Sequence, residues 1–215
     1  MSARDAILGR VRAALTGEAG TIAPTYELWP SGTWQDPTDL FEQFAEELRR
    51  VQGESKRCNA IEAARGFLGE LHKELGKPQT VCIDHPTCRE AVQGFENAVV
   101  LDAAMDRKQL AAVPLAIMSA EFLLADTGTV VVLPRNHAER LLCYLPDVSI
   151  LIARGGSVVA HLSDVWEAIT KQAVDPESRG EMLLVTGPSR TADIEKKLVL
   201  GAHGPRRLIV ILIEE

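Results

Sequence analysis

The stretch that decides the fold is Leu208-Ile-Val-Ile-Leu-Ile213, a run of six aliphatic residues shortly after a Gly-Pro turn. A continuous run of this kind, without polar alternation, is typical of a strand buried on both faces of a parallel sheet. Val148-Ser-Ile-Leu-Ile-Ala153 and Thr129-Val-Val-Val-Leu133 have the same character. The chain therefore contains strands that need a covering layer on each side of their sheet.

Shorter apolar runs and amphipathic segments alternate outward from these strands. We expect further strands at 80–83, 98–101, 115–118 and 182–186, and a helical turn at 119–124. Helices are expected from Asp36-Pro37 to before Gly53 and at 59–75, 85–93, 106–111, 162–170 and 191–199. This alternation predicts an α/β fold, a three-layer α/β/α sandwich with a mostly parallel sheet.

The first 35 residues differ from the remainder. Residues 2–15 have the apolar spacing of a short amphipathic helix, and glycines and prolines then interrupt regular structure up to Gly32. This arm contains Tyr26, Trp29 and Trp34, and exposed tryptophans favour docking on the same domain or on a second subunit of a homo-oligomer. We expect an N-terminal helix and arm at 1–35 and one α/β domain at 36–215.

Composition excludes several classes of protein. The net charge of −7 argues against a nucleic-acid partner. The four cysteines form no CxxC pair and the five histidines no HxxxH or HExxH spacing, so we expect no metal and no iron–sulfur cluster. No P-loop or dinucleotide motif indicates a cofactor. We find no apolar run long enough for a membrane span and no secretory leader, which predicts a cytoplasmic location.

The first candidate for chemistry is Ala125-Asp-Thr-Gly-Thr129, which places a carboxylate, two hydroxyls and a glycine before a buried strand. Gly128 allows a positive φ or the close approach of a ligand. The alternative is a plain Asx turn, in which Asp126 accepts local backbone hydrogen bonds.

The second candidate is Gly187-Pro-Ser-Arg-Thr-Ala-Asp-Ile-Glu195, predicted to be a turn that leads into a helix. Ser189 or Thr191 can cap that helix, and Asp193 and Glu195 favour its positive end. Capping alone explains these residues. Arg190 is different, because a cation at this end opposes the helix dipole; an anionic ligand or a pair with Asp193 accounts for it.

The third candidate is the loop Gly201-Ala-His-Gly-Pro205, from which His203 can reach the same crevice or serve a structural role. Arg140, followed by Leu145-Pro146, is either an anion clamp or a surface charge.

Taken in order, the 125–129 turn, Arg140 with Leu145-Pro146, the 187–195 string and the 201–205 loop form a series that resembles the lactate utilisation protein C family (LutC/YkgG), with its LUD domain. The resemblance covers the last hundred residues closely and the first 80 in helical layout. It implies a fold similar to the NagB/RpiA/CoA-transferase-like fold. It also implies a bacterial role in the oxidation of L-lactate to pyruvate, beside two partner proteins that hold iron–sulfur clusters.

Three hypotheses follow. The leading one is a lactate-utilisation protein with a crevice at the strand carboxyl ends for lactate, pyruvate or a phosphate-bearing ligand. The second is a subunit without chemistry that docks iron–sulfur oxidoreductase partners. The third is a CoA-transferase-like enzyme with Asp126 as its nucleophile, which the resemblance implies. The crevice would bind its ligand through Thr127, Gly128, Thr129, Arg140, Gly187, Ser189, Arg190 and Thr191, and any proton chemistry would fall to Asp126, Asp193, Glu195 and His203.

Overall fold

The structure is a computed structural model that describes residues 3–15, 39–173, 181–194, 197–200 and 204–215. The chain divides into two compact units, Met1–Gln35 and Asp36–Glu215. The first contains helix α1 (Ala3–Leu15), which confirms the amphipathic helix expected there. Tyr26, Trp29 and Trp34 lie outside the described residues, so their docking stays a prediction.

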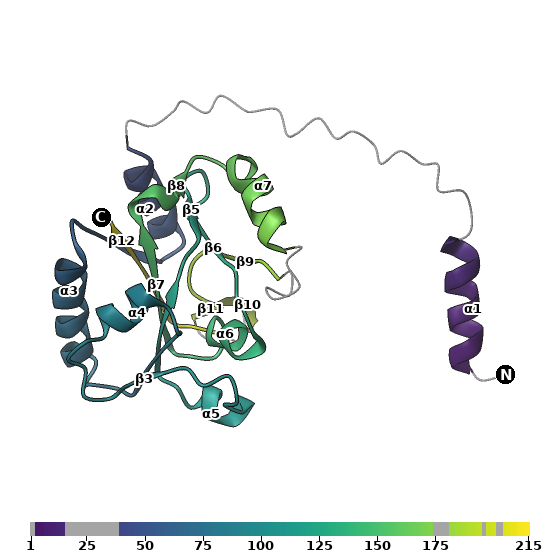
Figure 1. Cartoon of the computed structure of the whole chain (residues 1–215), viewed down its shortest axis with the longest axis horizontal. Coiled ribbons are helices and arrows are strands. Elements are labelled where there is room, and N and C mark those ends of the chain that lie inside the picture. The colour runs from purple at the N-terminus through teal and green to yellow at the C-terminus, as the bar shows by residue number, and fades with distance from the viewer. Residues whose placement is uncertain (1–2, 16–38, 174–180, 195–196, 201–203) are drawn as a thin grey trace. The chain divides into compact units, whose positions relative to one another are not determined.

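The second unit is organised around a six-stranded sheet with the order β1-β12-β7-β4-β2-β3 (Figure 1). Every neighbouring pair is parallel, and the longest ladder joins β7 and β12 from Val148↔Arg207 to Arg154↔Ile213. All residues of β12 from Leu208 to Ile213 are buried, as the aliphatic run predicts. The strands are β1 (Glu54–Cys58), β2 (Thr80–Cys82), β3 (Ala98–Val100), β4 (Leu115–Ser119), β7 (Val148–Arg154) and β12 (Arg207–Ile213).

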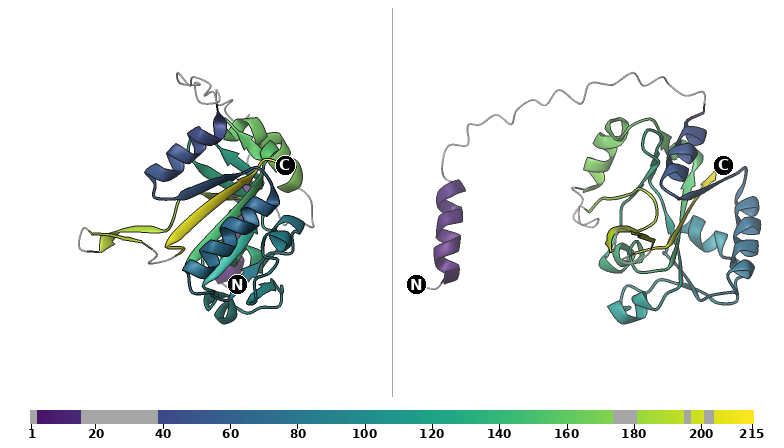
Figure 2. Two further views of the ribbon diagram at one scale, coloured as in Figure 1. Left: turned by 90° about the vertical axis from the view of Figure 1, so that its left-hand side faces the viewer. Right: turned by 180° about the vertical axis from the view of Figure 1, so that it is seen from behind.

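Helices and a second sheet cover the two faces (Figures 1 and 2). Helices α3 (Ile61–Glu74) and α4 (Pro86–Ala91) pack on one side and contact each other. The other side holds a mixed sheet of order β8-β5-β6-β9. Its strands are β5 (Phe122–Leu124), β6 (Thr129–Val132), β8 (Val158–Val159), which follows the short 3₁₀ helix η1 (Gly155–Ser157), and β9 (Leu183–Val185).

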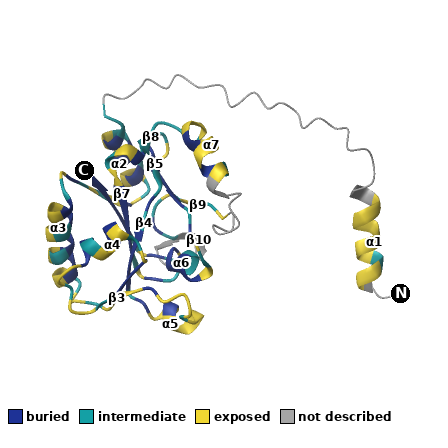
Figure 3. Ribbon diagram, viewed as in Figure 1, coloured by how far each residue is buried: buried dark blue, intermediate teal, exposed yellow. Residues whose placement is uncertain are grey.

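Four more helices complete the described part of the domain. Helix α2 (Leu40–Arg50) contacts β1 as well as β5 and β8. Helix α7 (Leu162–Ala173) packs on the second sheet through Val165 and Ile169, which meet Leu124 and Val131. Short helices α5 (Arg107–Ala111) and α6 (His137–Leu142) contact each other. Figure 3 shows the resulting pattern, with buried strands between helices whose outer faces are exposed. The three-layer α/β/α architecture with a mostly parallel sheet is confirmed.

The helix expected at 191–199 is wrong. The described residues of this segment instead form two antiparallel strands, β10 (Arg190–Ile194) and β11 (Lys197–Leu200), which we call the β10–β11 hairpin. The backbone N–H of Ser189 donates to the carbonyl of Pro205 at 2.8 Å, which ties the segment to the start of β12 instead of to a helical turn. Because Thr191, Ile194 and Val199 are β-branched, they favour strands over helices.

Other expectations also need correction. The helical turn at 119–124 is wrong, because Phe122–Leu124 pairs with β6 as strand β5. Helix α2 begins at Leu40 with Asp39 as its N-cap, not at Asp36-Pro37, which lie outside the described residues. Strand β1 was not foreseen, since its sequence Glu-Ser-Lys-Arg-Cys has no apolar run; it is an edge strand whose exposure alternates.

Two glycine turns press against the end of α2. Gly128, between β5 and β6, has a φ of 62°, and a Cβ there would overlap the backbone nitrogen of Leu48. Gly187, after β9, has a φ of 88°, and its Cβ would lie 2.9 Å from Cγ2 of Val51. Positive φ is inexpensive only for glycine. The two turns that sequence analysis assigned to a ligand therefore have a packing role.

Replacing Gly128 with alanine should destabilise the domain by at least about 2 kcal/mol, because the methyl group meets both a positive φ and the α2 backbone. Gly66, in the interior of α3 with open space around its Cβ position, is the matched control. Gly66→Ala should raise stability by about 0.5–1 kcal/mol. Urea denaturation of both variants measures the difference, and equal midpoints would contradict the close approach.

Asp39 should stabilise the domain in two separable ways. Its carboxylate accepts from the N–H groups of Phe41 and Glu42 and pairs with Arg57 of β1. The Arg57 hydrogen bond is the main cause that lowers the Asp39 pKa from 3.8 to about 2. Asp39→Ala removes the cap and the pair and should cost about 1–2 kcal/mol. Asp39→Asn keeps a capping oxygen and should cost under about 1 kcal/mol, since the pair is exposed.

The pH dependence distinguishes the two contributions of Asp39. A depressed folded-state pKa gives stability that is present above the unfolded value near 3.9 and lost as the pH falls toward 2. The gap in unfolding free energy between wild type and Asp39→Asn should therefore shrink between pH 5 and about 2. A gap that stays constant over this range in chemical denaturation would show that the ion pair contributes nothing.

Candidate functional site

The segments predicted to form a crevice partly converge. The 125–129 turn joins β5 to β6, and β6 pairs with β9, so that the hydroxyls of Thr129 and Thr186 are hydrogen-bonded at 2.7 Å. The Gly187–Ser189 turn follows directly and contacts Pro205 through the Ser189 N–H. The two turns are thus neighbours, held together by the hydroxyl pair.

The Asp126 carboxylate is bound within the protein. Thr127 Oγ1 donates to it at 3.1 Å, and Nδ1 of His161 lies 3.0 Å from Oδ2. The Asp126 N–H also donates to the carbonyl of Ala160. These contacts tie the β5–β6 turn to the residue that precedes α7. Sequence analysis did not single out His161, and no spacing signal could have found a partner 35 residues away.

The remaining predicted residues are dispersed. Arg140 lies on α6, where its guanidinium pairs with Glu181 at 3.2 Å and contacts His137 Nδ1 at 2.8 Å. Arg190, Thr191 and Asp193 lie on strand β10 rather than at a helix N-terminus, so the helix-dipole argument for an anion does not apply to them. Glu195 and His203 lie outside the described residues.

A cavity of about 80 Å³ lies at the carboxyl ends of β2 and β4. These strands are neighbours in the parallel sheet, and this edge is where α/β folds usually bind ligands. A third segment, which follows β6 into α6, completes the wall. The lining residues are Ile83, His85, Met118, Ser119, Glu121, Val132, Leu133, Pro134, Arg135 and Glu139.

Arg135 and Glu139 form a clamp in this wall. The buried Glu139 carboxylate accepts from the Arg135 backbone N–H at 2.8 Å, from Nε at 3.1 Å and from Nη2 at 2.9 Å. Nη2 also donates to the carbonyl of Asp84 after β2. Asn136 caps α6 through the Glu139 N–H, which positions Glu139 in the first helical turn. Within the described chain, Nη1 of Arg135 has no partner.

His85 enters the cavity from the loop between β2 and α4. Its Nδ1 is buried and finds no hydrogen-bond partner among the described residues. Burial lowers the pKa of the imidazole below its usual value of 6.5, and the positive charge of Arg135 lowers it further. The ring is therefore mainly neutral at pH 7, and Arg135 is the cationic side chain of the cavity wall.

Ser119 is the last residue of β4 and Glu121 follows the strand, and they supply the other polar groups. Neither the Ser119 hydroxyl nor the Glu121 carboxylate bonds to another described residue. Sequence analysis did not single out His85, Ser119, Arg135 or Glu139, although three of them lie directly or closely after strands that it predicted correctly. The usable signal was position after a buried strand. The polar wall consists of His85, Ser119, Glu121, Arg135 and Glu139.

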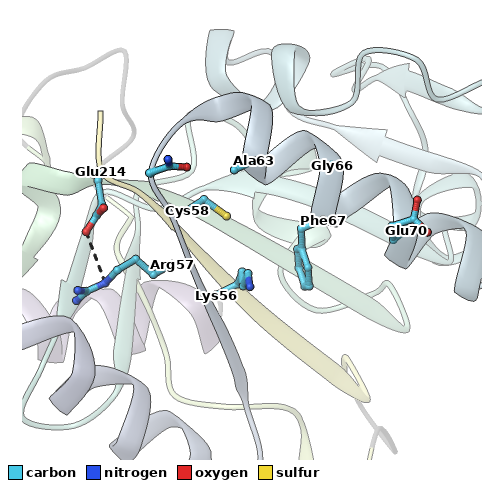
Figure 4. Close-up of a pocket in the computed structure, with 9 residues that line it drawn as sticks. Lys56, Arg57, Cys58, Ala63, Gly66, Phe67, Glu70 and Glu214 are labelled. Carbon is cyan, nitrogen blue, oxygen red and sulfur yellow. Dashed lines mark ion pairs between the residues drawn. The ribbon is translucent and has the colours of Figure 1, made fainter.

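A larger groove of about 650 Å³ lies between β1 and α3 (Figure 4). Its cations already have partners within the groove: Arg57 lies 3.7 Å from Glu214, and Lys56 lies over the ring of Phe67. The Cys58 thiol is buried, and burial raises its pKa, so it is a poor nucleophile. This groove offers a ligand fewer uncommitted polar groups than the smaller cavity.

The described part of the chain contains no cluster of three or more His, Cys, Asp or Glu that could hold a metal ion. No helix in it has the length and apolar character needed to cross a membrane.

Comparison with known families identifies the domain. The family model of the LUD domain matches residues 41–213. The chain belongs to the LUD domain family. The Escherichia coli K12 protein YkgG is 31% identical over 192 residues, which are 84% of this chain and 81% of YkgG. Lactate utilization protein C from Anoxybacillus flavithermus is 30% identical over 82% of this chain and 81% of that protein.

Other relatives match this LUD protein over a shorter length. Lactate utilization protein C from Geobacillus thermodenitrificans is 38% identical over 103 residues, 46% of this chain and 42% of that protein. A crystal structure of a DUF162 family protein from Deinococcus radiodurans matches with a TM-score of 0.60 and 18% identity over 81% of this chain and 96% of the other. The resemblance to the LutC/YkgG family is confirmed, and the names of the relatives support a role in lactate utilisation.

Proposed function

We propose that this LUD domain protein serves in lactate utilisation by holding a small organic acid anion, such as lactate or pyruvate, in the cavity beside β2 and β4. The observation that carries the proposal is the Arg135 guanidinium, which Glu139 and the Asp84 carbonyl hold in place while Nη1 stays unbonded among the described residues. A guanidinium fixed in this way can bind a carboxylate with little further loss of side-chain freedom.

The size of the cavity supports a ligand of a few heavy atoms. Its volume of about 80 Å³ is several times the ~10–15 Å³ that one water needs. It is well below the ~300 Å³ at which pockets for drug-sized ligands begin. Lactate and pyruvate, each with three carbons, fit between these limits.

The site proposed here keeps the predicted location at strand carboxyl ends but uses different residues. A crevice built from Asp126–Thr129 and Gly187–Thr191 remains a prediction, as does a CoA-transferase reaction with Asp126 as nucleophile. Against these alternatives, the Asp126 carboxylate already has Thr127 and His161 as partners. The hydroxyls of Thr129 and Thr186 likewise satisfy each other.

Isothermal titration of the full chain with lactate and pyruvate tests the proposal. Arg135→Lys keeps a cation beside Glu139 but removes the fixed Nη1 donor, and should weaken binding about tenfold or more, as for loss of a charge-assisted hydrogen bond. Ser119→Ala provides a second cavity variant that leaves the clamp intact. Glu70→Gln, at an exposed pair with Lys73, is the control.

The outcome of this titration separates the two locations. Weaker binding in Arg135→Lys with unchanged binding in Glu70→Gln supports the cavity, provided that thermal unfolding shows both variants folded. Weaker binding in Asp126→Asn with no change in Arg135→Lys would assign the ligand to the β5–β6 turn instead. Absence of binding of either acid to the wild-type chain refutes the small-acid site.

A second candidate function is an interaction subunit for the iron–sulfur oxidoreductase partners. The observation in its favour is the β10–β11 hairpin, which pairs with neither larger sheet among the described residues and extends away from them (Figure 2, left). An isolated two-stranded hairpin is marginally stable in water, so a partner surface would stabilise it.

Replacing residues 190–200 with a short Gly-Ser linker should abolish co-purification with iron–sulfur oxidoreductase subunits if the hairpin is their docking element. The linker variant should still bind lactate, because the hairpin contributes no residue to the cavity wall. Co-purification that survives the replacement would exclude the hairpin, and a homo-oligomer that dissociates in the variant would assign it to self-association.

A further inference from the structure

The charges around the cavity are unevenly distributed. Arg135 and Glu139 neutralise each other in their clamp, and the His85 ring is mainly neutral at pH 7. Glu121 remains as the wall carboxylate without a cationic partner among the described residues. A bare anion that enters therefore meets one guanidinium and two carboxylates.

Arg154 is the other cation whose charge acts on His85, and it is already committed. Its Nε and Nη2 donate to Thr87 Oγ1 at 3.3 and 3.2 Å, and its Nη1 donates to the carbonyl of Glu215 at 3.1 Å. It is not part of the cavity wall. Arg154 could therefore turn toward Glu121 only by breaking these bonds, which leaves Arg135 as the cation that shares the cavity wall with Glu121.

The two unpaired charged groups of the wall differ in hydrogen bonding, whereas the Ser119 hydroxyl and the neutral His85 ring can each donate or accept. An arginine only donates, and an ionised carboxylate only accepts. The cavity thus has a donor region at Arg135 Nη1 and an acceptor region at Glu121. A ligand that satisfies both regions must carry a carboxylate for the first and an N–H or O–H hydrogen for the second.

We propose that Glu121 is the specificity-determining residue of this site. It restricts the cavity to small monoanions with a hydrogen-bond donor next to the carboxylate, which is the chemistry of a 2-hydroxy acid. The inference rests on the proposed small-acid site and adds the choice between ligands. A 2-oxo acid presents a carbonyl oxygen to Glu121, and a phosphate dianion brings a second negative charge toward both carboxylates.

The expected preference for lactate over pyruvate follows from the Glu121 carboxylate, which pyruvate leaves without a hydrogen-bond donor. A site that accepts a hydroxyl hydrogen rejects the analogue without it, because the acceptor is left unsatisfied. For a partly buried carboxylate, the expected preference for lactate over pyruvate is about tenfold. Inorganic phosphate should bind more weakly than either acid.

Titration of the full-length wild type and of Glu121→Gln with lactate, pyruvate and inorganic phosphate tests this assignment. The glutamine amide has the shape of the carboxylate but can also donate, so it can pair with a carbonyl oxygen. The lactate-to-pyruvate affinity ratio should fall from about tenfold toward one, mainly through tighter pyruvate binding. Glu70→Gln removes the same charge outside the cavity and should leave the ratio unchanged.

The results distinguish this inference from the proposed function. If the wild type binds both acids equally, or if Glu121→Gln keeps the preference for lactate, Glu121 does not set specificity although the small-acid site stands. If phosphate binds as tightly as lactate, the charge argument is wrong. If no acid binds the wild type, both proposals fail. Should Glu121→Gln not fold, the wild-type ratio alone decides, since equal binding overturns the assignment.

Discussion

The structure depends on the burial of both faces of β7 and β12. Their seven-residue ladder is the longest in the sheet, and nearly every side chain on the two strands is buried. A strand of this kind is stable only when each face of its sheet is covered. Helices α3 and α4 supply one cover, and α2 with the second sheet supplies the other. Since all six strands run parallel, the loops after β2 and β4 emerge at one edge, and the cavity follows from that geometry.

The packing of α2 against the second sheet explains why polar residues in the sequence resembled a ligand site. Gly128 and Gly187 allow two turns to approach α2, and the Thr129–Thr186 hydroxyl pair joins the strands that bear them. Asp126 links the same region to the start of α7 through His161. A carboxylate, hydroxyls and glycines at strand ends are also what a small-anion site needs. Residue type alone does not separate these uses, because the difference lies in partners distant in sequence.

The sequence predicted correctly what residue type determines, and it failed where partners distant in the sequence decide the structure. Strands β4, β6, β7 and β12 were predictable because aliphatic runs report burial directly. Strand β1 was not, since an edge strand with an exposed face carries Glu54, Lys56 and Arg57. Strands β10 and β11 contain both helix-compatible and β-branched residues, and it is their pairing with each other that decides the structure. The polar wall of the cavity comes from three separate segments, so only the topology brings His85, Glu121 and Arg135 together.

In the proposed site, the clamp on Arg135 would let a protein with a net charge of −7 bind a small anion. Glu139 removes the excess positive charge of the guanidinium but fixes its orientation, so attraction comes from one directed donor instead of from net charge. The polar residues of the cavity wall come from two different sheets. Arg135 follows β6 of the second sheet, whereas Ser119 ends a strand of the first sheet and His85 and Glu121 follow strands of it. The separation of Arg135 from Glu121 therefore depends on how the two sheets pack against each other.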